Sequence, residues 1–423
     1  MNPLFDVVVI GAGAAGLVAA AEAAERGKRT LLVEKNRRPG VKILISGGTR
    51  CNLTHATDKW GIVRAYGEQG KFLHSALAAL SPDDLVQLVE QEGVATKVEE
   101  TGKVFPVSDR ATDVLAALLR RFERSGAVLA VEEPVQRLER AADGRFQVAT
   151  ALRELSAEKL IVTVGGQSYP GSGTTGDGYP WAVAFGHTII PPRPALVPLT
   201  TNEPWVRELS GVTIADVAVE LFVRSVVEGS AQQELTPPRP IDRRQGSLLF
   251  THFGLSGPVI LDVSRGVSAL ANPSLAVLSC DFLPGISAND LDAHLRQAAA
   301  ADGKRHVVGI LSESLSRRLA EALLARASLS AELRAAEFSK AARAALLQAV
   351  KSTPIPVSGT RGFAKAEVTA GGVALNEVDS RTMESKLVPG LFFAGEILDL
   401  DGPIGGYNFQ AAFSTGVLAG RSV

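Results

Sequence analysis

A glycine-rich turn between a short apolar strand and an alanine-rich helix constrains this 423-residue chain more than any other feature. Residues 6–10 are apolar and mostly β-branched, which is typical of a strand buried on both faces. The turn that follows consists of Gly11, Ala12, Gly13, Ala14, Ala15 and Gly16. A helix to Arg26 and a second buried strand over 30–33, followed by Glu34, complete a predicted βαβ unit.

Each glycine of this turn has a physical task in dinucleotide binding. Gly11 makes the tight turn, Gly13 lets the backbone approach a pyrophosphate, and Gly16 lets helix and strand pack closely. The N-terminus of the helix offers free amides and a partial positive charge to the phosphates. Glu34 stands where an acid accepts hydrogen bonds from a ribose, so the sequence predicts a dinucleotide cofactor.

Composition narrows the class of protein. Apolar residues make up 46% and charged residues 21%, which predicts a folded globular chain, and its length suits two or three domains. The formal net charge of −1 supplies no global field for nucleic acid. Arg37, Arg38, Lys42 and Arg50 lie close together in sequence, which leaves two interpretations open: solvated surface charge, which we favour, and a local basic face.

The two cysteines, Cys51 and Cys280, lie far apart, which argues against a disulfide framework or a redox dithiol and fits a reducing cytoplasm. The six histidines form no ligand pair, so we expect no metal centre. The apolar run over 7–21 is too short to cross a bilayer, and no cleavable leader is expected.

Periodicity divides the chain into three expected domains. Residues 1–192 and 356–423 should form a discontinuous cofactor domain, 193–286 an inserted β-rich domain with strands near 351–360, and 287–350 a small helical domain. Four short strands should form an antiparallel meander; these are Ala127–Val131, Val135–Leu138, Arg145–Thr150 and Lys159–Val164. Alternating strands are expected from 194 to 265. The fold class is α/β.

Three later features favour FAD over a nicotinamide cofactor. The strand ending in Gly165-Gly166 can bring a second loop to the cofactor. Gly395-Glu396, followed by Asp399 and Asp401, places acids after a buried strand, where they can bind a ribityl hydroxyl. The segment from Gly405 through Gly406 and Tyr407 to Asn408 precedes a helix whose positive end can stabilise negative charge on reduced flavin.

Five segments resemble one family of bacterial flavoproteins. They are Ser46–Thr54 (SGGTRCNLT), Gly171–Tyr179 (GSGTTGDGY), Leu249–Pro258 (LFTHFGLSGP), Thr382–Lys386 (TMESK) and Gly405–Gln410 (GGYNFQ). The family includes bile-acid enone reductases and ribosomal RNA dihydrouridine synthases, and the resemblance covers nearly the whole chain. It implies a Rossmann-like FAD domain built from both chain ends, with an inserted β-rich domain and a small helical one.

The resemblance and the motifs together predict non-covalent FAD binding. Val41 and His55 depart from the family pattern, where arginine and asparagine are usual. The expected cofactor contacts are Gly11, Gly13, Ala14, Ala15, Gly16, Glu34, Lys35, Lys42, Ser46, Gly47, Gly48, Cys51, Asn52, Val135, Gly165, Gly166, Gly395, Glu396, Asp401, Gly402, Gly405, Gly406, Tyr407 and Asn408.

Other motifs fail on inspection. Residues 171–176 have P-loop spacing, but Asp177 replaces the phosphate-binding lysine. Pro170 takes the last glycine place of a GxSxG around Ser168, which argues against a hydrolase nucleophile. No second strand–GxGxxG–helix unit is predicted, so NAD(P)H should bind only transiently, over the flavin.

Cys51 and His252 are the candidate catalytic residues. Reduction of a polarised C=C bond needs a proton donor. Cys51 is the leading candidate, because Arg50 cannot give up its proton and Asn52 has none to give. The alternative for Cys51 is a small residue packed under the flavin ring. His252 is the reserve donor, or a satisfied polar residue at a strand end.

We therefore expect an oxidoreductase that passes hydride from NAD(P)H through flavin N5 to an enone or a uracil-like ring. The alternatives are an oxidase of a small amine and a non-enzymatic FAD-binding sensor. The substrate is a small molecule or a nucleobase; ribosomal RNA is an open possibility that the net charge does not support. No membrane partner is expected.

Overall fold

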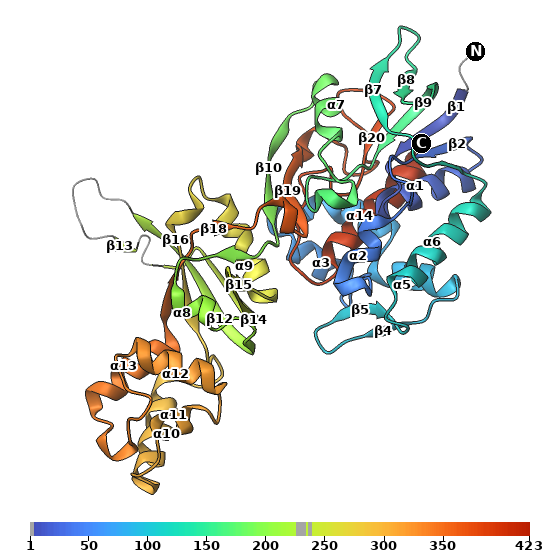
Figure 1. The fold of residues 1–423 in the computed structure, drawn as a ribbon. Helices are drawn as coiled ribbons and strands as arrows, with labels where there is room; N and C mark the ends of the chain where they lie inside the picture. The colour runs from blue at the N-terminus through green and yellow to red at the C-terminus, as the bar shows by residue number, and fades with distance from the viewer. Residues whose placement is uncertain (1–3, 226–233, 236–238) are drawn as a thin grey trace. The chain divides into compact units, whose positions relative to one another are not determined.

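The computed structural model describes residues 4–225, 234–235 and 239–423, which form two compact units (Figure 1). Unit 1 comprises residues 1–193 and 367–423, and unit 2 comprises residues 194–366. Each unit has its own hydrophobic core.

The strands of unit 1 form a seven-stranded sheet, a three-stranded sheet and a two-stranded one. The large sheet contains β1 (Leu4–Ile10), β2 (Thr30–Val33), β6 (Val128–Ala130), β7 (Val135–Arg140), β8 (Phe146–Thr150), β9 (Glu154–Val162) and β20 (Leu391–Phe393). The small sheets contain β3 (Thr54–His55), β4 (Thr96–Val98) and β5 (Lys103–Pro106), and β10 (Ile189–Ala195) and β19 (Val368–Val373).

The large sheet runs in the order β6-β2-β1-β9-β8-β7, and β20 pairs with the second half of β9. Its strands β6, β2, β1, β9 and β20 are parallel, whereas β7, β8 and β9 are antiparallel to their neighbours in turn. The expected four-stranded antiparallel meander is therefore wrong in its first strand. Because the helix before β6 acts as a crossover, β6 lies parallel to β2.

Eight α-helices belong to the described part of unit 1. They are α1 (Ala14–Glu25), α2 (Val41–Thr49), α3 (Lys59–Ala65), α4 (His74–Ala79), α5 (Pro82–Gln91), α6 (Ala111–Ser125), α7 (Gly178–Ala184) and α14 (Tyr407–Ser422). The expected start of α5 is confirmed, since Ser81 and Asp84 form a capping box. Gly126, with φ of 82°, ends α6 as expected.

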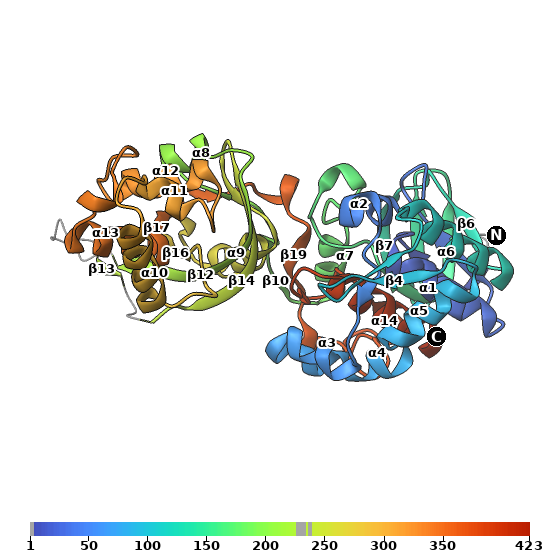
Figure 2. The same ribbon diagram turned by 90° about the horizontal axis from the view of Figure 1, so that it is seen from below.

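Unit 2 combines an antiparallel sheet with helices. Its strands are β11 (Leu199–Thr200), β12 (Thr213–Ser225), β13 (Glu234–Leu235), β14 (Asp242–Thr251), β15 (Gly254–Ser256), β16 (Ala276–Asp281), β17 (Thr353–Pro356) and β18 (Gly359–Thr360). Its helices are α8 (Pro204–Glu208), α9 (Pro258–Ala269), α10 (Ala288–Ala301), α11 (Val307–Leu311), α12 (Arg317–Arg326) and α13 (Lys340–Lys351). Figure 2 shows α10, α11, α12 and α13 gathered in one cluster.

The expectation of strands alone between 194 and 265 is wrong, because α8 and α9 lie in this stretch. Helix α9 begins at Pro258 and buries Val259, Val263 and Val267, which share one helical face. The helices of 287–350 share one apolar core with the sheet. Strands β17 and β18 belong to this sheet, so the chain returns to unit 1 at Glu367 rather than near 356.

No helix in the described ranges is long and apolar enough to cross a membrane.

Candidate cofactor site

The predicted binding motifs of unit 1 meet at one edge of the parallel sheet. Gly11 follows β1, Glu34 follows β2, Gly165 lies just beyond β9, and Gly395 lies just beyond β20. These four strands are mutually parallel, so their carboxyl ends point to the same edge. Ligands of open α/β sheets bind outside this edge.

The first glycine turn has the geometry that its sequence predicts. A Cβ on Gly11, whose φ is 99°, would lie 2.9 Å from the Thr163 carbonyl oxygen, and a Cβ on Gly16 would lie 1.9 Å from the Gly11 carbonyl oxygen. A Cβ on Gly13 would meet no atom within 4 Å. Two glycines are thus required by the protein itself, whereas Gly13 leaves open space beside the helix N-terminus.

Helix α1 begins at this turn. Ala14 and Ala15 are buried in its first turn, and no side chain caps its N-terminus. The first amides of a helix have no partner within the helix and carry a partial positive charge. They suit a phosphate that approaches over Gly13.

Glu34 is held by backbone amides on both sides. Its Oε2 accepts from the Ala12 N–H at 2.8 Å, and its Oε1 accepts from the Asn36 N–H at 2.8 Å. The carboxylate is buried, and its backbone carbonyl accepts from the Glu133 N–H at 3.0 Å. That contact brings the segment leading into β7, which begins at Val135, to the end of β2. The carboxylate is oriented before any ligand arrives.

Lys42 and Glu396 form the centre of a polar ring at the same edge. The Lys42 Nζ donates to Glu396 Oε2 at 2.5 Å and to Ser168 Oγ at 2.6 Å, and Ser168 Oγ donates to Glu396 Oε1 at 2.6 Å. The Thr369 N–H donates to Glu396 Oε1 at 2.9 Å. The ring ties α2, β19 and the loops after β9 and β20 together.

Ser168 and Thr369 are residues of this ring that sequence reasoning did not assign to the site. The Thr369 Oγ1 accepts from the N–H groups of Gln167 and Ser168 at 2.8 and 2.9 Å. A Cβ on Gly166 would lie 2.4 Å from this oxygen. The Gly371-Gly372 pair inside β19 was the available signal, since glycine within a strand can mark close backbone approach.

Lys35 reaches a different loop. Its Nζ donates to Asp177 at 2.5 Å and to Thr175 Oγ1 at 2.7 Å. Burial alone would raise the pKa of Asp177, but the hydrogen bonds from Lys35 and Thr175 outweigh it and lower that pKa. Asp177 therefore anchors Lys35 and the loop over 171–176.

The loop over 46–52 has an unusual backbone. Gly47 and Gly48 have φ of 54° and 68°, and the non-glycine residues Thr49 and Cys51 have φ of 69° and 63°. Left-handed conformations cost non-glycine residues of order 1 kcal/mol each unless their surroundings hold them. Ser46 Oγ donates to the Ile43 carbonyl oxygen at 2.9 Å and closes the preceding turn.

Arg50 fastens this loop to the β4–β5 hairpin. Its guanidinium lies 3.9 Å from the centre of the Phe105 ring and donates to Glu99 at 2.6 Å. The hydrogen bond to Glu99 raises the pKa of Arg50, so the side chain is a fixed cation. Asp109 lies 3.4 Å from the same nitrogen.

Asn52 connects this loop to the turn before α14. Its side-chain amide donates to the carbonyl oxygens of Val104 and Thr54 at 3.3 and 3.0 Å and accepts from the Gly406 N–H at 3.0 Å. A Cβ on Gly406 would lie 2.4 Å from the Thr54 carbonyl oxygen, so only glycine fits there. The Asn52 side chain is thus engaged by the protein on three sides.

The departure from the family pattern at His55 lies at the same junction. The His55 ring stacks on Tyr407 with centroids 4.7 Å apart, and its Nδ1 lies 3.2 Å from the Gly405 carbonyl oxygen. Asn408 Oδ1 accepts from the Gly402 N–H at 2.8 Å, and its amide donates back to the Gly402 carbonyl oxygen. The segment over 402–408 is a closed turn that presents the N-terminus of α14, and no side chain caps that helix.

Asp401, which directly precedes this turn, is buried, with 4% of its surface exposed.

The structure places Cys51 in the interior of the protein. Its accessible surface is 0%, and burial raises the pKa of its thiol to about 12, although a hydrogen bond from Ser46 lowers it in part. The burial argues against Cys51 as a proton donor, and its alternative role, a small residue packed under the flavin ring, stays a prediction.

His252 belongs to unit 2. It lies in the turn between β14 and β15, its side chain is exposed, and its ring contacts Phe253 edge to face. No group of histidine, cysteine and acidic residues in the described ranges could hold a metal ion.

The residues of this edge fit a flavin dinucleotide. Open space over Gly13, an uncapped helix N-terminus and an oriented Glu34 carboxylate suit the adenosine diphosphate half. The second uncapped helix, α14, is presented by a turn that Asn52 and Asn408 hold in place. A positive helix end is suited to a flavin ring that becomes negative on reduction.

Comparison with known proteins agrees with this geometry. The model of the HI0933-like protein Rossmann domain matches residues 5–422. The chain is 34% identical over 412 residues to the ribosomal RNA dihydrouridine synthase of Escherichia coli, covering 97% of this chain and 96% of that protein. It is 32% identical over 430 residues to the Haemophilus influenzae protein of the same name, covering 100% and 99%.

A third relative has a different name. The chain is 31% identical over 423 residues to the 3-dehydro-bile acid delta(4,6)-reductase of Clostridium scindens, covering 98% of both proteins. The chain therefore belongs to the HI0933-like family of FAD-dependent Rossmann-fold oxidoreductases. The family resemblance seen in the sequence motifs is confirmed.

Proposed function

We propose that this protein is an FAD-dependent reductase that transfers hydride from NAD(P)H to a C=C bond conjugated with a carbonyl group. The observation that carries the proposal is that the names of two relatives imply the same type of reaction. The names dihydrouridine synthase and delta(4,6)-reductase both describe an enzyme that saturates such a double bond. Both matches span nearly the whole chain.

Bound FAD supplies the hydride from its N5 atom. The role of the protein in this chemistry is to hold the cofactor and to stabilise the negative charge of the reduced ring. The turn over 402–408 presents the N-terminus of α14, whose partial positive charge favours the reduced, negatively charged ring. NAD(P)H binds transiently in this proposal, because the other GxGxxG match, GSGTTG over 171–176, does not directly follow a strand: β9 ends at Val162.

A proton must also reach the carbon next to the carbonyl group. The two candidates differ in exposure: Cys51 is fully buried, whereas His252 is exposed. General acid catalysis contributes about 10² to 10⁴ in rate. His252 is therefore the first residue to replace, and loss of rate in His252→Ala with normal flavin reduction is the expected result.

The substrate is tested by removing the gene. Mass spectrometry of ribosomal RNA from the strain with and without it measures dihydrouridine directly. Loss of one dihydrouridine, restored by the gene on a plasmid, assigns the nucleobase. If the modification is unchanged, the purified flavoprotein is assayed with NADH or NADPH against a panel of steroid enones, without oxygen.

The assay also separates the alternatives. Rapid reoxidation by oxygen with release of peroxide would replace the proposal by an oxidase. A flavoprotein that turns over with no donor or acceptor would replace it by a sensor.

A further inference from the structure

The two helices that present their N-termini to the cofactor edge cross in backbone contact. A Cβ on Gly416 of α14 would lie 2.4 Å from the Ala15 carbonyl oxygen of α1, and a Cβ on Gly420 would lie 2.3 Å from the Ala19 carbonyl oxygen. Contacts this short to backbone atoms are not relieved by a change of rotamer. The crossing therefore fixes how closely α1 and α14 approach each other.

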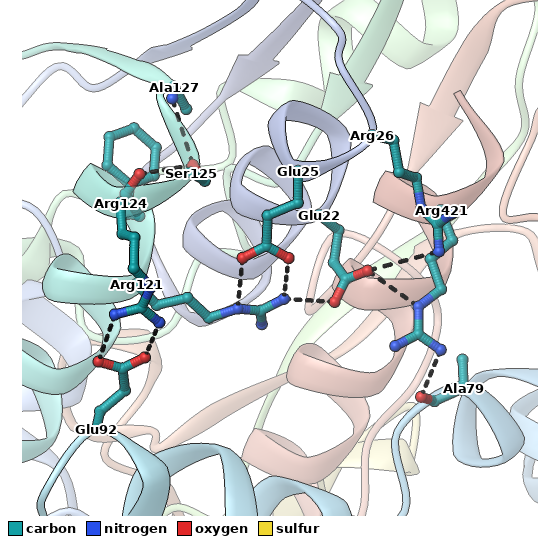
Figure 3. Close-up of polar contacts among 11 residues, drawn as sticks. Glu22, Glu25, Arg26, Ala79, Glu92, Arg121, Arg124, Ser125, Ala127 and Arg421 are labelled. Atoms are coloured by element: carbon teal, nitrogen blue, oxygen red, sulfur yellow. Dashed lines mark hydrogen bonds and ion pairs between the residues drawn. The ribbon is translucent and has the colours of Figure 1, made fainter.

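Beyond this crossing, Glu22 of α1 holds both α6 and α14 (Figure 3). Its Oε1 accepts from Arg121 Nη2 at 2.5 Å, and its Oε2 accepts from Arg421 Nε at 3.0 Å. Arg121 also donates to both oxygens of Glu25, at 2.8 and 3.1 Å. Arg421 Nη1 donates to the Ala79 carbonyl oxygen at the end of α4, at 2.9 Å.

The Glu22 carboxylate is charged as well as buried. The residue is only 7% exposed, and burial by itself raises its pKa. The hydrogen bonds from Arg421 and Arg121 outweigh burial, so the pKa of Glu22 is lowered. Glu22 pairs with both Arg121 and Arg421, so loss of one arginine removes one of its links but leaves the carboxylate paired with the other.

We propose that this Glu22 cluster, formed by Glu22, Arg121 and Arg421, positions the N-termini of α1 and α14 and thereby sets the affinity for FAD. The inference rests on FAD as the cofactor of the proposed function. Ala14 and Glu22 are eight residues apart on α1, about 12 Å along the helix, so the cluster does not touch the cofactor. Glu22 and its partners are positioning residues.

The cluster can affect FAD affinity because it fixes the relative orientation of α1 and α14. α1 meets the pyrophosphate and α14 the flavin ring, so FAD affinity depends on the distance and angle between the two N-termini. The glycine crossing allows rotation about the contact, and the Glu22–Arg421 pair beyond it stops that rotation. Each misplaced amide weakens a charge-assisted hydrogen bond to the cofactor.

The test replaces one link at a time in the holoprotein. Arg421→Gln removes the α1–α14 link but leaves Glu22 paired with Arg121. Arg124→Gln is the matched control, since Arg124 is also an exposed arginine bound to a carboxylate, that of Glu92, but makes no link to α14. FAD release on dilution, followed by flavin fluorescence, gives the dissociation constant, and thermal unfolding gives stability.

We expect about ten-fold weaker FAD binding in Arg421→Gln, wild-type binding in Arg124→Gln, and recovery of at least half the lost affinity in Arg421→Lys. The absorption band of the bound flavin should lose fine structure in the first variant only. Gly420→Ala, which forces the helices apart by other means, should weaken FAD binding at least as much.

A lower melting temperature in Arg421→Gln with unchanged FAD affinity would overturn the proposal, because the cluster would then serve stability alone. Equal loss of affinity in Arg124→Gln would overturn it too. Absence of FAD from the wild-type protein would instead refute the cofactor assignment, so the two failures are distinguishable.

Discussion

Two glycine-rich segments of unit 1 differ in how they obtain their backbone shape. In the turn over 11–16, the tight positions are occupied by glycine, and the structure shows a steric reason for Gly11 and Gly16. In the loop over 46–52, Thr49 and Cys51 adopt left-handed conformations that glycine would adopt more easily. The first segment is relaxed, and the second is held in place by its contacts.

The difference shows which function each segment can carry. A relaxed turn binds through backbone amides and needs no side chain. A strained loop persists only where side chains fasten it, as Arg50 does through Glu99 and Asn52 does through Gly406. Its exposed faces, rather than its buried thiol, are then available to a ligand. The following substitutions test this comparison.

The largest effect is expected from the first turn. Gly16→Ala should destroy the fold of unit 1, because its Cβ would lie 1.9 Å from a backbone oxygen. Gly13→Ala is the control with the opposite pattern: its Cβ meets no protein atom, so thermal stability should remain while FAD affinity falls. Equal stability of both variants would contradict the steric argument.

The next effect concerns Glu34. Glu34→Ala should weaken FAD binding by about ten-fold or more, since charge-assisted hydrogen bonds contribute roughly 1.5 to 3 kcal/mol. It also leaves the Ala12 and Asn36 amides without their acceptor, so some loss of stability is expected. Glu34→Gln keeps one acceptor oxygen and separates the two effects. Unchanged affinity in both variants, measured by fluorescence titration, would refute the ribose contact.

A smaller effect is expected from replacing Cys51, and the result decides whether this residue acts as a general acid. If the loop binds only through its exposed faces, Cys51→Ala should leave FAD bound and change the rate of hydride transfer to the acceptor by less than about three-fold. Its cost should be near 1 kcal/mol of stability, from the lost sulfur. A hundred-fold slower oxidative half-reaction in stopped-flow measurements would instead restore Cys51 as the general acid.

The smallest expected effect is a gain in stability on replacing Thr49. Thr49→Gly should raise the free energy of unfolding by about 0.5 kcal/mol, because relief of the left-handed strain exceeds the entropy that glycine loses. Thr112→Gly in α6 is the control and should lower it, since glycine weakens a helix. Urea titration measures both, and a loss in Thr49→Gly would show that the loop is not strained.

Sequence reasoning succeeded where the signal was local. The turn over 11–16 and the strand that follows α1 are specified by neighbouring residues. The ring of Lys42, Ser168, Thr369 and Glu396 was missed as a unit because its members are far apart in the chain, and only the fold brings them together. The burial of Cys51 was equally invisible, since it depends on packing rather than on spacing.

The wrong predictions for the direction of β6 and for the helix α9 have similar causes. β6 has the composition of any short strand, and the crossover before it decides its direction. The apolar residues after Pro258 read as a strand by composition, although proline at a first helical position was available as a signal.

The discontinuity of unit 1 sets an order of events during synthesis. Residues 194–366 leave the ribosome before β20 and α14 exist, so unit 2 can complete its fold while the sheet of unit 1 still lacks its last strand. The nascent chain carries the turn over 11–16 early, whereas the turn over 402–408 is among the last segments to be made. In the proposed function, tight FAD binding therefore has to wait until the chain is almost complete, and a truncated product that lacks α14 should bind FAD more weakly.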